Sequence, residues 1–178
     1  SSAASDVYKR QTMAFGIPII ERIDPDSEDV QAVILAPTRE LAMQITDEMR
    51  QIAVCHEGVR LVCLYGGQPI AKQINALKRR PQIVVATPGR LSDHMKRRTV
   101  TLGQVQTVVL DEADRMLDMG FIHDVTRILD KIPHRKNLGM FSATISREVM
   151  DISWVYQRDP EEITVQATRE NKPDILQY

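Results

Sequence analysis

Short apolar runs alternate along this chain with segments of helical periodicity. Six runs rich in β-branched residues predict strands at Ala32–Leu35, Val59–Leu64, Ile83–Ala86, Val105–Leu110, Leu138–Phe141 and Ile163–Val165. Most of these runs are apolar at nearly every position, which indicates strands that are covered on both faces. Between them lie amphipathic segments such as Thr38–Val54, whose apolar residues recur at helical spacing behind a threonine N-cap. This alternation predicts an α/β fold with a doubly wound, mainly parallel sheet and helices on both faces.

Polar loops follow five of the predicted strands, and ligands of such sheets bind where the strands end. The loops contain Pro37-Thr38-Arg39, Gly66-Gly67, Thr87-Pro88-Gly89-Arg90, Asp111-Glu112-Ala113-Asp114 and Ser142-Ala143-Thr144. Because the carboxyl ends of parallel strands share one edge, we expect all five loops to converge there.

The chemistry of the acidic loop fits phosphoanhydride hydrolysis. One carboxylate at a strand end can hold a divalent cation through water, and a second beside it can orient the attacking water. Alone, an acidic tetrapeptide is more often a solvated turn. Its companions favour the functional interpretation, since Thr38 and Thr87 each open a helix whose free N–H groups favour an anion. Such loops suit a phosphodiester backbone that is contacted without reading bases.

Composition narrows the function classes further. With 178 residues, 43% of them hydrophobic, the chain is long enough for one globular domain. The net charge of −1 gives the chain no overall electrostatic attraction to nucleic acid, so any nucleic-acid-binding site must depend on a local group of positive charges. We interpret the basic runs 78–80 and 96–98 as solvated helix ends. No apolar run is long enough for a membrane span and no secretory leader is visible, which predicts a cytoplasmic protein without membrane contact.

Taken in order, the motifs APTRELA, GG, TPGR, DEAD followed by DRMLDMGF, and SAT resemble the first RecA-like domain of the DEAD-box ATP-dependent RNA helicases of superfamily 2. The resemblance runs from about Thr12 to the end of the chain. It implies a RecA-like fold, ATP and magnesium as cofactors, RNA as the partner, and a second RecA-like domain in the full-length protein.

The resemblance also assigns roles to individual residues. Asp111 corresponds to the magnesium-associated carboxylate, through water, and Glu112 to the residue that activates the attacking water. Asp114 with Ser142, Ala143 and Thr144 corresponds to the motifs that link nucleotide state to RNA strand separation. The RNA-backbone contacts correspond to Pro37, Thr38, Arg39, Gly66, Gly67, Thr87, Gly89 and Arg90.

One family motif is absent from the sequence. A P-loop needs Gly-Lys-Thr or Gly-Lys-Ser, and none of the eight glycines is followed by lysine. Thr12–Ile20 resembles the stretch after the P-loop lysine, with Thr12 in the place of the magnesium-binding hydroxyl. We therefore predict a non-native leader at 1–11, a first helicase domain lacking the Q motif and the P-loop strand at 12–168, and the start of an interdomain linker at 169–178.

Three function classes remain open at this point. The first is a piece of an ATP-dependent RNA helicase that is inactive in ATP hydrolysis by itself. The second is a non-catalytic RNA- or protein-binding remnant, and the third is another superfamily 2 enzyme such as a DNA translocase. The motifs DEAD, rather than DEAH, together with TPGR and SAT, argue against the third class.

Overall fold

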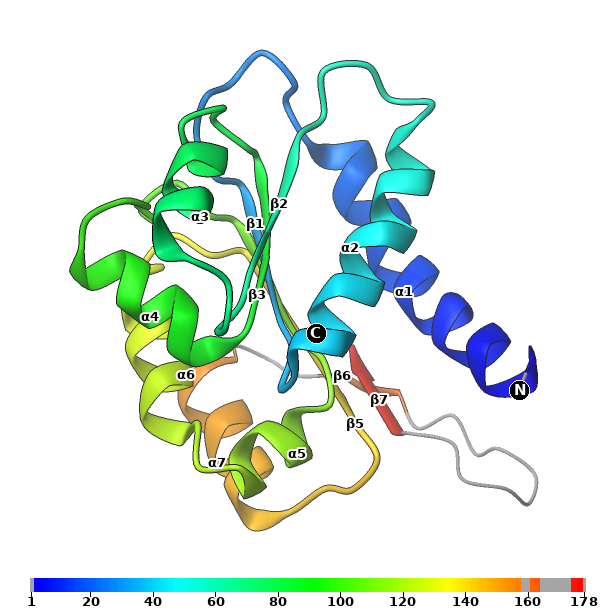
Figure 1. Ribbon diagram of the computed structural model, residues 1–178. Helices are drawn as coiled ribbons and strands as arrows, with labels where there is room; N and C mark the ends of the chain where they lie inside the picture. Colours follow the sequence, from blue (N-terminus) through cyan, green and yellow to red (C-terminus); the bar gives the residue numbers. More distant parts are fainter. Residues whose placement is uncertain (1, 158–160, 164–173, 178) are drawn as a thin grey trace.

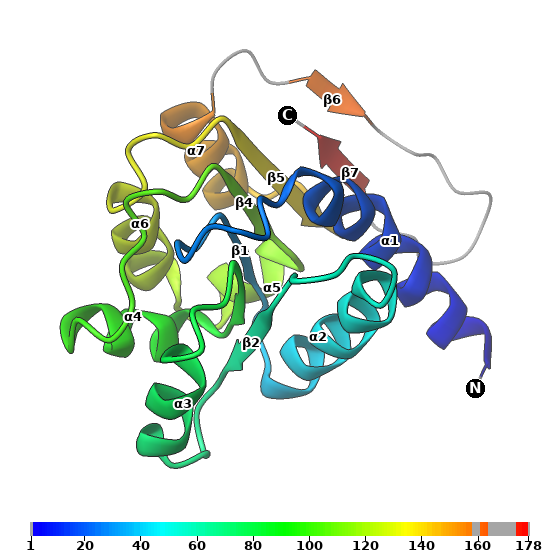
Figure 2. The same ribbon diagram turned by 90° about the horizontal axis from the view of Figure 1, so that it is seen from above.

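The structure is a computed structural model that describes residues 2–157, 161–163 and 174–177, and within them it contains one mixed sheet between two layers of helices (Figures 1 and 2). The strands are β1 (Ala32–Leu35), β2 (Leu61–Leu64), β3 (Ile83–Ala86), β4 (Thr107–Leu110), β5 (Asn137–Ser142), β6 (Glu161–Ile163) and β7 (Asp174–Gln177). Their order is β2-β3-β1-β4-β5-β7-β6. The first five are parallel, whereas β7 is antiparallel to β5 and to β6. The sheet is therefore mainly parallel, as predicted.

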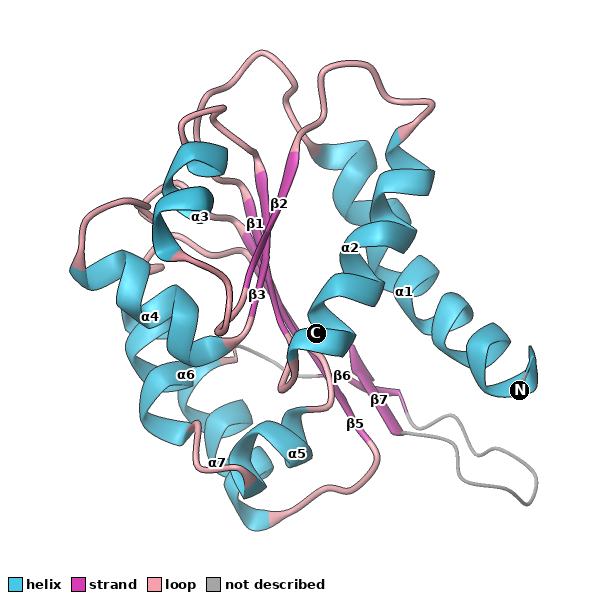
Figure 3. Cartoon of the chain, in the orientation of Figure 1, coloured by secondary structure: helices cyan, strands magenta, loops and turns pink. Residues whose placement is uncertain are grey.

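Helices cover both faces of this sheet (Figure 3). They are α1 (Ser2–Arg22), α2 (Arg39–Ala53), α3 (Ile70–Leu77), α4 (Pro88–Lys96), α5 (Ala113–Asp118), α6 (Ile122–Asp130) and α7 (Arg147–Tyr156). Helices α1 and α2 pack on one face, and α3 to α7 contribute to the core on the other. The predicted doubly wound architecture is confirmed.

Strand β1 shows why the apolar runs are continuous. Ala32 and Ile34 join the core under α1 and α2, while Val33 and Leu35 join the core under the opposite helices. None of the four is more than 1% exposed. Since successive side chains of a strand point to opposite faces, a strand with two covered faces needs an apolar residue at every position.

Strand boundaries match the prediction at β1 and β3 and differ elsewhere. β2 begins at Leu61 rather than Val59, because the Arg60 amide donates to the side chain of Gln82 at 2.7 Å and not to a neighbouring strand. Val105 is fully buried, but its amide donates to the Leu102 carbonyl in a turn, so β4 begins two residues later than predicted. β5 is one residue longer at each end. Burial and ladder pairing are separate properties, and the apolar pattern reports only burial.

The ends of the chain carry more secondary structure than their composition indicates. Residues 2–11 lie in α1, and 174–177 form β7, within the segment predicted to begin a linker. The strand predicted at Ile163–Val165 overlaps β6 at Ile163, and positions 164 and 165 lie outside the described residues. The proposed boundaries at 12 and 169 stay predictions.

The register of the parallel strands aligns their carboxyl ends. Leu35 pairs with both Ala86 and Leu110, and Ala86 also pairs with Leu64. The ladder continues into the loops: the amides of Ala36, Thr87 and Asp111 donate to the carbonyls of Ala86, Leu64 and Leu35 at 2.9–3.0 Å. The polar loops therefore leave the sheet at one edge, as expected.

Candidate functional site at the carboxyl edge of the sheet

Asp111 lies directly after β4 and is only 3% exposed. Its Oδ1 accepts a hydrogen bond from the Glu112 amide at 3.0 Å. Burial, and then the neighbouring Glu112 charge, raise the pKa of Asp111 from 3.8 to about 7, while that amide opposes the shift and Glu48 adds to it. A carboxylate in this position gains most from a cation, because a cation would offset both its desolvation and its repulsion from Glu112.

Glu112 has a left-handed backbone, with φ 49° and ψ 52° at the N-cap of α5. A side chain is rarely accommodated in this region, so the turn is strained. Its carboxylate is half-buried and lies 3.3 Å from the Arg115 guanidinium. Of the two neighbouring acids, Asp111 is thus enclosed at the end of the sheet, whereas Glu112 is more exposed.

Asp114 is joined to the loop after β5 by a compact hydrogen-bond cluster. Thr144 donates to Asp114 Oδ2 from both its amide, at 3.2 Å, and its hydroxyl, at 3.0 Å. The Asp114 amide in turn donates to Ser142 Oγ at 3.2 Å, and that hydroxyl donates to the Thr144 carbonyl at 2.6 Å. The structure thus brings together two motifs that lie about thirty residues apart in sequence. Ala143 is exposed between them.

The loops after β1 and β2 meet through an arginine. Thr38 caps α2 by accepting from the Leu41 amide at 3.2 Å. Next to it, the Arg39 guanidinium lies 5.0 Å from the centre of the Tyr65 ring, a cation–π contact. Gly67 has φ +91°, and a Cβ placed there would lie 3.7 Å from the Arg39 guanidinium. The glycine is therefore required by the left-handed turn, and a side chain there would only reach ordinary contact with the arginine.

Not every residue predicted to contact RNA offers its side chain at this edge. Pro37 is buried, and the Arg90 guanidinium donates to the Gln68 carbonyl at 3.0 Å and to Gln73 Oε1 at 3.2 Å. Thr87 precedes α4 without capping it through its hydroxyl, and a Cβ on Gly89 would meet the Phe121 ring at 3.8 Å. The predicted contacts thus divide into side chains that face outward and side chains that hold the loops.

Sequence reasoning missed the buried polar network that organises these loops. Gln73 is 1% exposed, and its Nε2 donates to the Tyr65 carbonyl at 2.8 Å and to Gln68 Oε1 at 3.0 Å. Its Oε1 also lies 2.9 Å from Nε2 of His94, a fully buried histidine. Burial, and then the Arg90 charge, lower the pKa of His94, which favours the neutral ring. Because the amide oxygen of Gln73 can only accept, Nε2 is the donor of this bond. One sequence signal was available: Gln73 stands between Ile70 and Leu77 on the apolar face of α3.

Thr12 is 3% exposed within α1. Phe15, one turn further along the same helix face, packs edge-on against Phe141 of β5 with ring centres 5.3 Å apart. Figure 1 shows α1 starting on the side of the molecule where the parallel strands end. This placement is compatible with the predicted role of Thr12 beside the nucleotide, which stays a prediction.

Two absences concern the described residues only. No group of three or more His, Cys, Asp or Glu side chains among them could hold a metal ion by itself. No helix in the described ranges is long and apolar enough to cross a membrane.

Comparison with known proteins decides the family. The model of the DEAD/DEAH box helicase family matches residues 11–152. This chain belongs to the DEAD/DEAH box helicase family. Its relatives include the DEAD-box ATP-dependent RNA helicases CshA of Bacillus subtilis and of Geobacillus kaustophilus, each 45% identical over 94% of the chain. The chain spans only 34% and 36% of the length of these curated relatives.

Solved structures agree with the family and the fold. The crystal structure of a DEAD box protein from Methanococcus jannaschii matches with a TM-score of 0.78 and 43% identity, over 84% of this DEAD-box chain and 40% of the other. The yeast DEAD-box splicing factor Prp28 matches with a TM-score of 0.78 and 35% identity, over 83% of this chain and 37% of its own. The RecA-like fold implied by the motifs is confirmed.

Proposed function

We propose that this chain is the part of an ATP-dependent RNA helicase that grips the RNA backbone and positions the water that attacks ATP. One observation carries the proposal: the Asp111–Glu112 pair and the Asp114–Thr144 cluster share the sheet edge with the loops that carry Thr38 and Arg39. A protein that couples hydrolysis to RNA release needs these two sites to be mechanically joined. The CshA relatives are named DEAD-box ATP-dependent RNA helicases, which supports the same activity for the whole protein.

The carboxylate pair fits a magnesium ion. Mg²⁺ prefers oxygen ligands and keeps several waters, so one or two carboxylates together with substrate phosphates suffice. Asp111 would hold the ion through water, and the ion would offset the burial and the Glu112 charge that raise the pKa of this carboxyl. When bound, magnesium would neutralise charge that develops on the phosphates. Glu112 would orient the attacking water and accept its proton.

ATP itself fits these residues only in part. Thr12 offers a hydroxyl and Asp111 the carboxylate, but the sequence contains no Gly-Lys-Thr or Gly-Lys-Ser to cradle the phosphates. We propose that the nucleotide site requires sequence that corresponds to the remainder of the longer relatives, including a second RecA-like domain. A cytoplasmic location belongs to the same proposal.

The catalytic assignment is tested in a chimera. The part of Bacillus subtilis CshA that precedes the matched region would be joined to Thr12, with the second domain of CshA following. We expect RNA-stimulated ATP hydrolysis that falls by about 100-fold or more in Glu112→Gln. Glu21→Gln, an exposed acid at the far end of α1, is the matched control and should keep full activity. A chimera that folds but hydrolyses ATP equally well with Glu112→Gln would refute the assignment.

The RNA surface is tested on the chain alone. Anisotropy of a labelled single-stranded RNA should show binding that weakens steeply between roughly 50 and 200 mM salt and does not depend on base sequence. Arg39→Ala should lower the salt dependence of RNA affinity by about one phosphate contact. Arg22→Ala, at the last residue of α1 and away from the carboxyl edge of the sheet, should not change it. Equal losses in the two variants would show that the loops at the sheet edge are not the RNA site.

A second candidate is a non-catalytic RNA-binding protein, which the missing Gly-Lys signature favours. This second candidate predicts the same salt-dependent RNA binding, and it predicts that ATP does not change the RNA affinity of the chain or of the chimera. Tighter binding of a DNA strand than of the matched RNA would instead point to a DNA translocase.

A further inference from the structure

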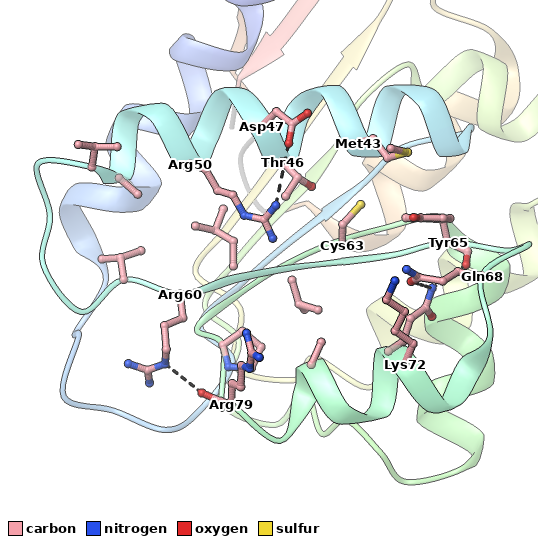
Figure 4. Close-up of a pocket in the computed structure, with 18 residues that line it drawn as sticks. Met43, Thr46, Asp47, Arg50, Arg60, Cys63, Tyr65, Gln68, Lys72 and Arg79 are labelled. Atoms are coloured by element: carbon pink, nitrogen blue, oxygen red, sulfur yellow. Dashed lines mark hydrogen bonds and ion pairs between the residues drawn. The ribbon is translucent and has the colours of Figure 1, made fainter.

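A groove of about 680 Å³ runs along the outer side of β2, between α2 and α3 (Figure 4). Apolar groups of Met43, Leu61 and Ala76 contribute to its walls, together with the half-buried Cys63 thiol. β2 is the last strand of the sheet on this side and pairs only with β3 among the described residues. The groove is thus the open edge of a parallel sheet.

The backbone of β2 offers hydrogen bonds to this groove. The carbonyls of Arg60 and Leu64 accept from the amides of Ile83 and Thr87, so the even-numbered residues turn their main-chain groups toward β3. Because these groups alternate in direction along a strand, Leu61 and Cys63 turn theirs outward. Tyr65 follows the same alternation, and its carbonyl accepts from the Gln73 side chain at the end of the groove.

The groove is strongly cationic for this chain. Its lining contains four cations and a single acid, Arg50, Arg60, Lys72 and Arg79 against Asp47, which is a local charge of +3 on a chain of net charge −1. The Arg60 guanidinium is held rigidly by the carbonyls of Gly58 and Arg80, both at 2.9 Å. Arg50 and Lys72 stand on the two helices that flank the strand, and the Arg50–Asp47 pair is loose at 3.9 Å and exposed.

We propose that this groove binds an extended acidic peptide of a partner protein, which adds to β2 as a further strand. A peptide strand supplies amides and carbonyls at the spacing that Leu61 and Cys63 require. Its side chains alternate, so apolar ones can face the groove wall while acidic ones meet the flanking cations. RNA would match the charge but not the outward-facing backbone of a strand. The groove reaches the proposed RNA surface only at its end, where Tyr65 and Gln68 line it, whereas the flanking cations Arg50 and Lys72 are not among the residues predicted to contact RNA.

The first experiment measures charge recognition with a defined probe. The probe is fluorescein-labelled Glu-Val-Glu-Val-Glu-Val-Glu, with Lys-Val-Lys-Val-Lys-Val-Lys and a version carrying a central proline as comparison peptides. We expect the chain to bind the acidic peptide, and the double variant Arg50→Glu with Lys72→Glu to weaken it by about tenfold or more. The matched double variant Lys96→Glu with Lys131→Glu, exposed and outside the groove, should bind normally. Equal affinity for the basic or the proline-containing peptide would overturn the proposal.

The second experiment locates the peptide by amide hydrogen exchange. Strand addition should slow amide exchange at Leu61 and Cys63. Exchange at Val62 and Leu64 should not change, because the amides of Val62 and Leu64 already face β3. Peptide binding without this alternating protection would overturn the proposal. A second contrary outcome is that single-stranded RNA displaces the peptide and that RNA binding itself is lost in the Arg50→Glu, Lys72→Glu variant. That outcome would make the groove an RNA site. A chain that dimerises through these same amides without peptide would assign the groove to a second copy.

Discussion

Asp111 is a carboxylic acid that the fold keeps away from water, and this makes stability depend on pH. Its pKa is about 7 in the folded chain against 3.8 as the ordinary value. Between these two values the folded state retains a proton that the unfolded state has released, so the free energy of unfolding falls as pH rises from about 4 to about 7. Above that range the buried charge is a constant penalty of a few kcal/mol at most.

Replacing this acid should therefore stabilise the chain at high pH. Asp111→Asn keeps an oxygen for the Glu112 amide but cannot ionise. In EDTA and without nucleotide, urea denaturation should show a gain at about pH 8 that disappears at about pH 4. The exposed Asp118→Asn is the control and should show no such pH-dependent gain. A gain of the same size at both pH values would mean that ionisation of Asp111 is not its cause.

The strained backbone of Glu112 gives a second residue-scale prediction. Glu112→Gly and Glu112→Ala both remove the ion pair with Arg115, but only glycine adopts φ 49° without a Cβ penalty. We expect the glycine variant to be more stable than the alanine variant by about 1 kcal/mol in thermal or urea unfolding. At Asp118, the last residue of α5, the order should reverse, because glycine is the poorer helix former. Alanine proving the more stable residue at 112 would show that the turn is not strained.

At the scale of elements, Gln73 connects α3 to α4 and to the loop after β2. Its amide makes four hydrogen bonds, to Tyr65, Gln68, Arg90 and His94. Because all of its polar atoms are used, the network is worth more than its separate bonds, and the loss of one member leaves buried groups unpaired. Arg90 thus holds the loop that contains Gly66 and Gly67, because its guanidinium donates to the Gln68 carbonyl and to Gln73 Oε1.

Gln73→Ala should therefore destabilise the chain by about 2–3 kcal/mol in urea denaturation. It should also weaken RNA binding, since the Gly66-Gly67 loop loses its anchor. Gln51→Ala, at an exposed position of α2, should change stability by less than about 0.5 kcal/mol. If the Gln73→Ala variant kept full stability and full RNA affinity, the hydrogen-bond network of Gln73 would have no role in positioning the RNA loops.

At the scale of the whole molecule, the loops that we propose to contact RNA and the carboxylates that we propose as catalytic occur in a sequence without Gly-Lys-Thr or Gly-Lys-Ser. We predict that the chain by itself hydrolyses ATP negligibly, with or without RNA, because no Gly-Lys pair can hold the phosphates in line with Glu112. Phosphate release at saturating ATP measures this directly. Turnover above the buffer rate that disappears in Glu112→Gln would contradict the prediction and would mean that these residues alone assemble a working site.

Much of the site could be predicted because it depends on local sequence and on one rule of topology. Apolar runs mark strands with two covered faces, and parallel strands present their carboxyl ends together. Asp111, Thr38 and Thr144 could thus be assigned to one edge before any contact was known. The beginnings of β2 and β4 were placed two residues too early, because the runs that begin at Val59 and Val105 each start before the part of the strand that pairs in register with its neighbour.

The sequence by itself thus determined the family, most of the strand segments and the edge of the sheet where the candidate site lies. Only the tertiary structure decided that Arg90 is held by Gln73, seventeen residues away, and that Glu112 takes a left-handed turn. It also decided that β2 lies at an open edge between two cationic helices. The reason is physical: periodicity records which side chains are buried, whereas strand order and hydrogen-bond partners depend on which distant segments come to lie side by side.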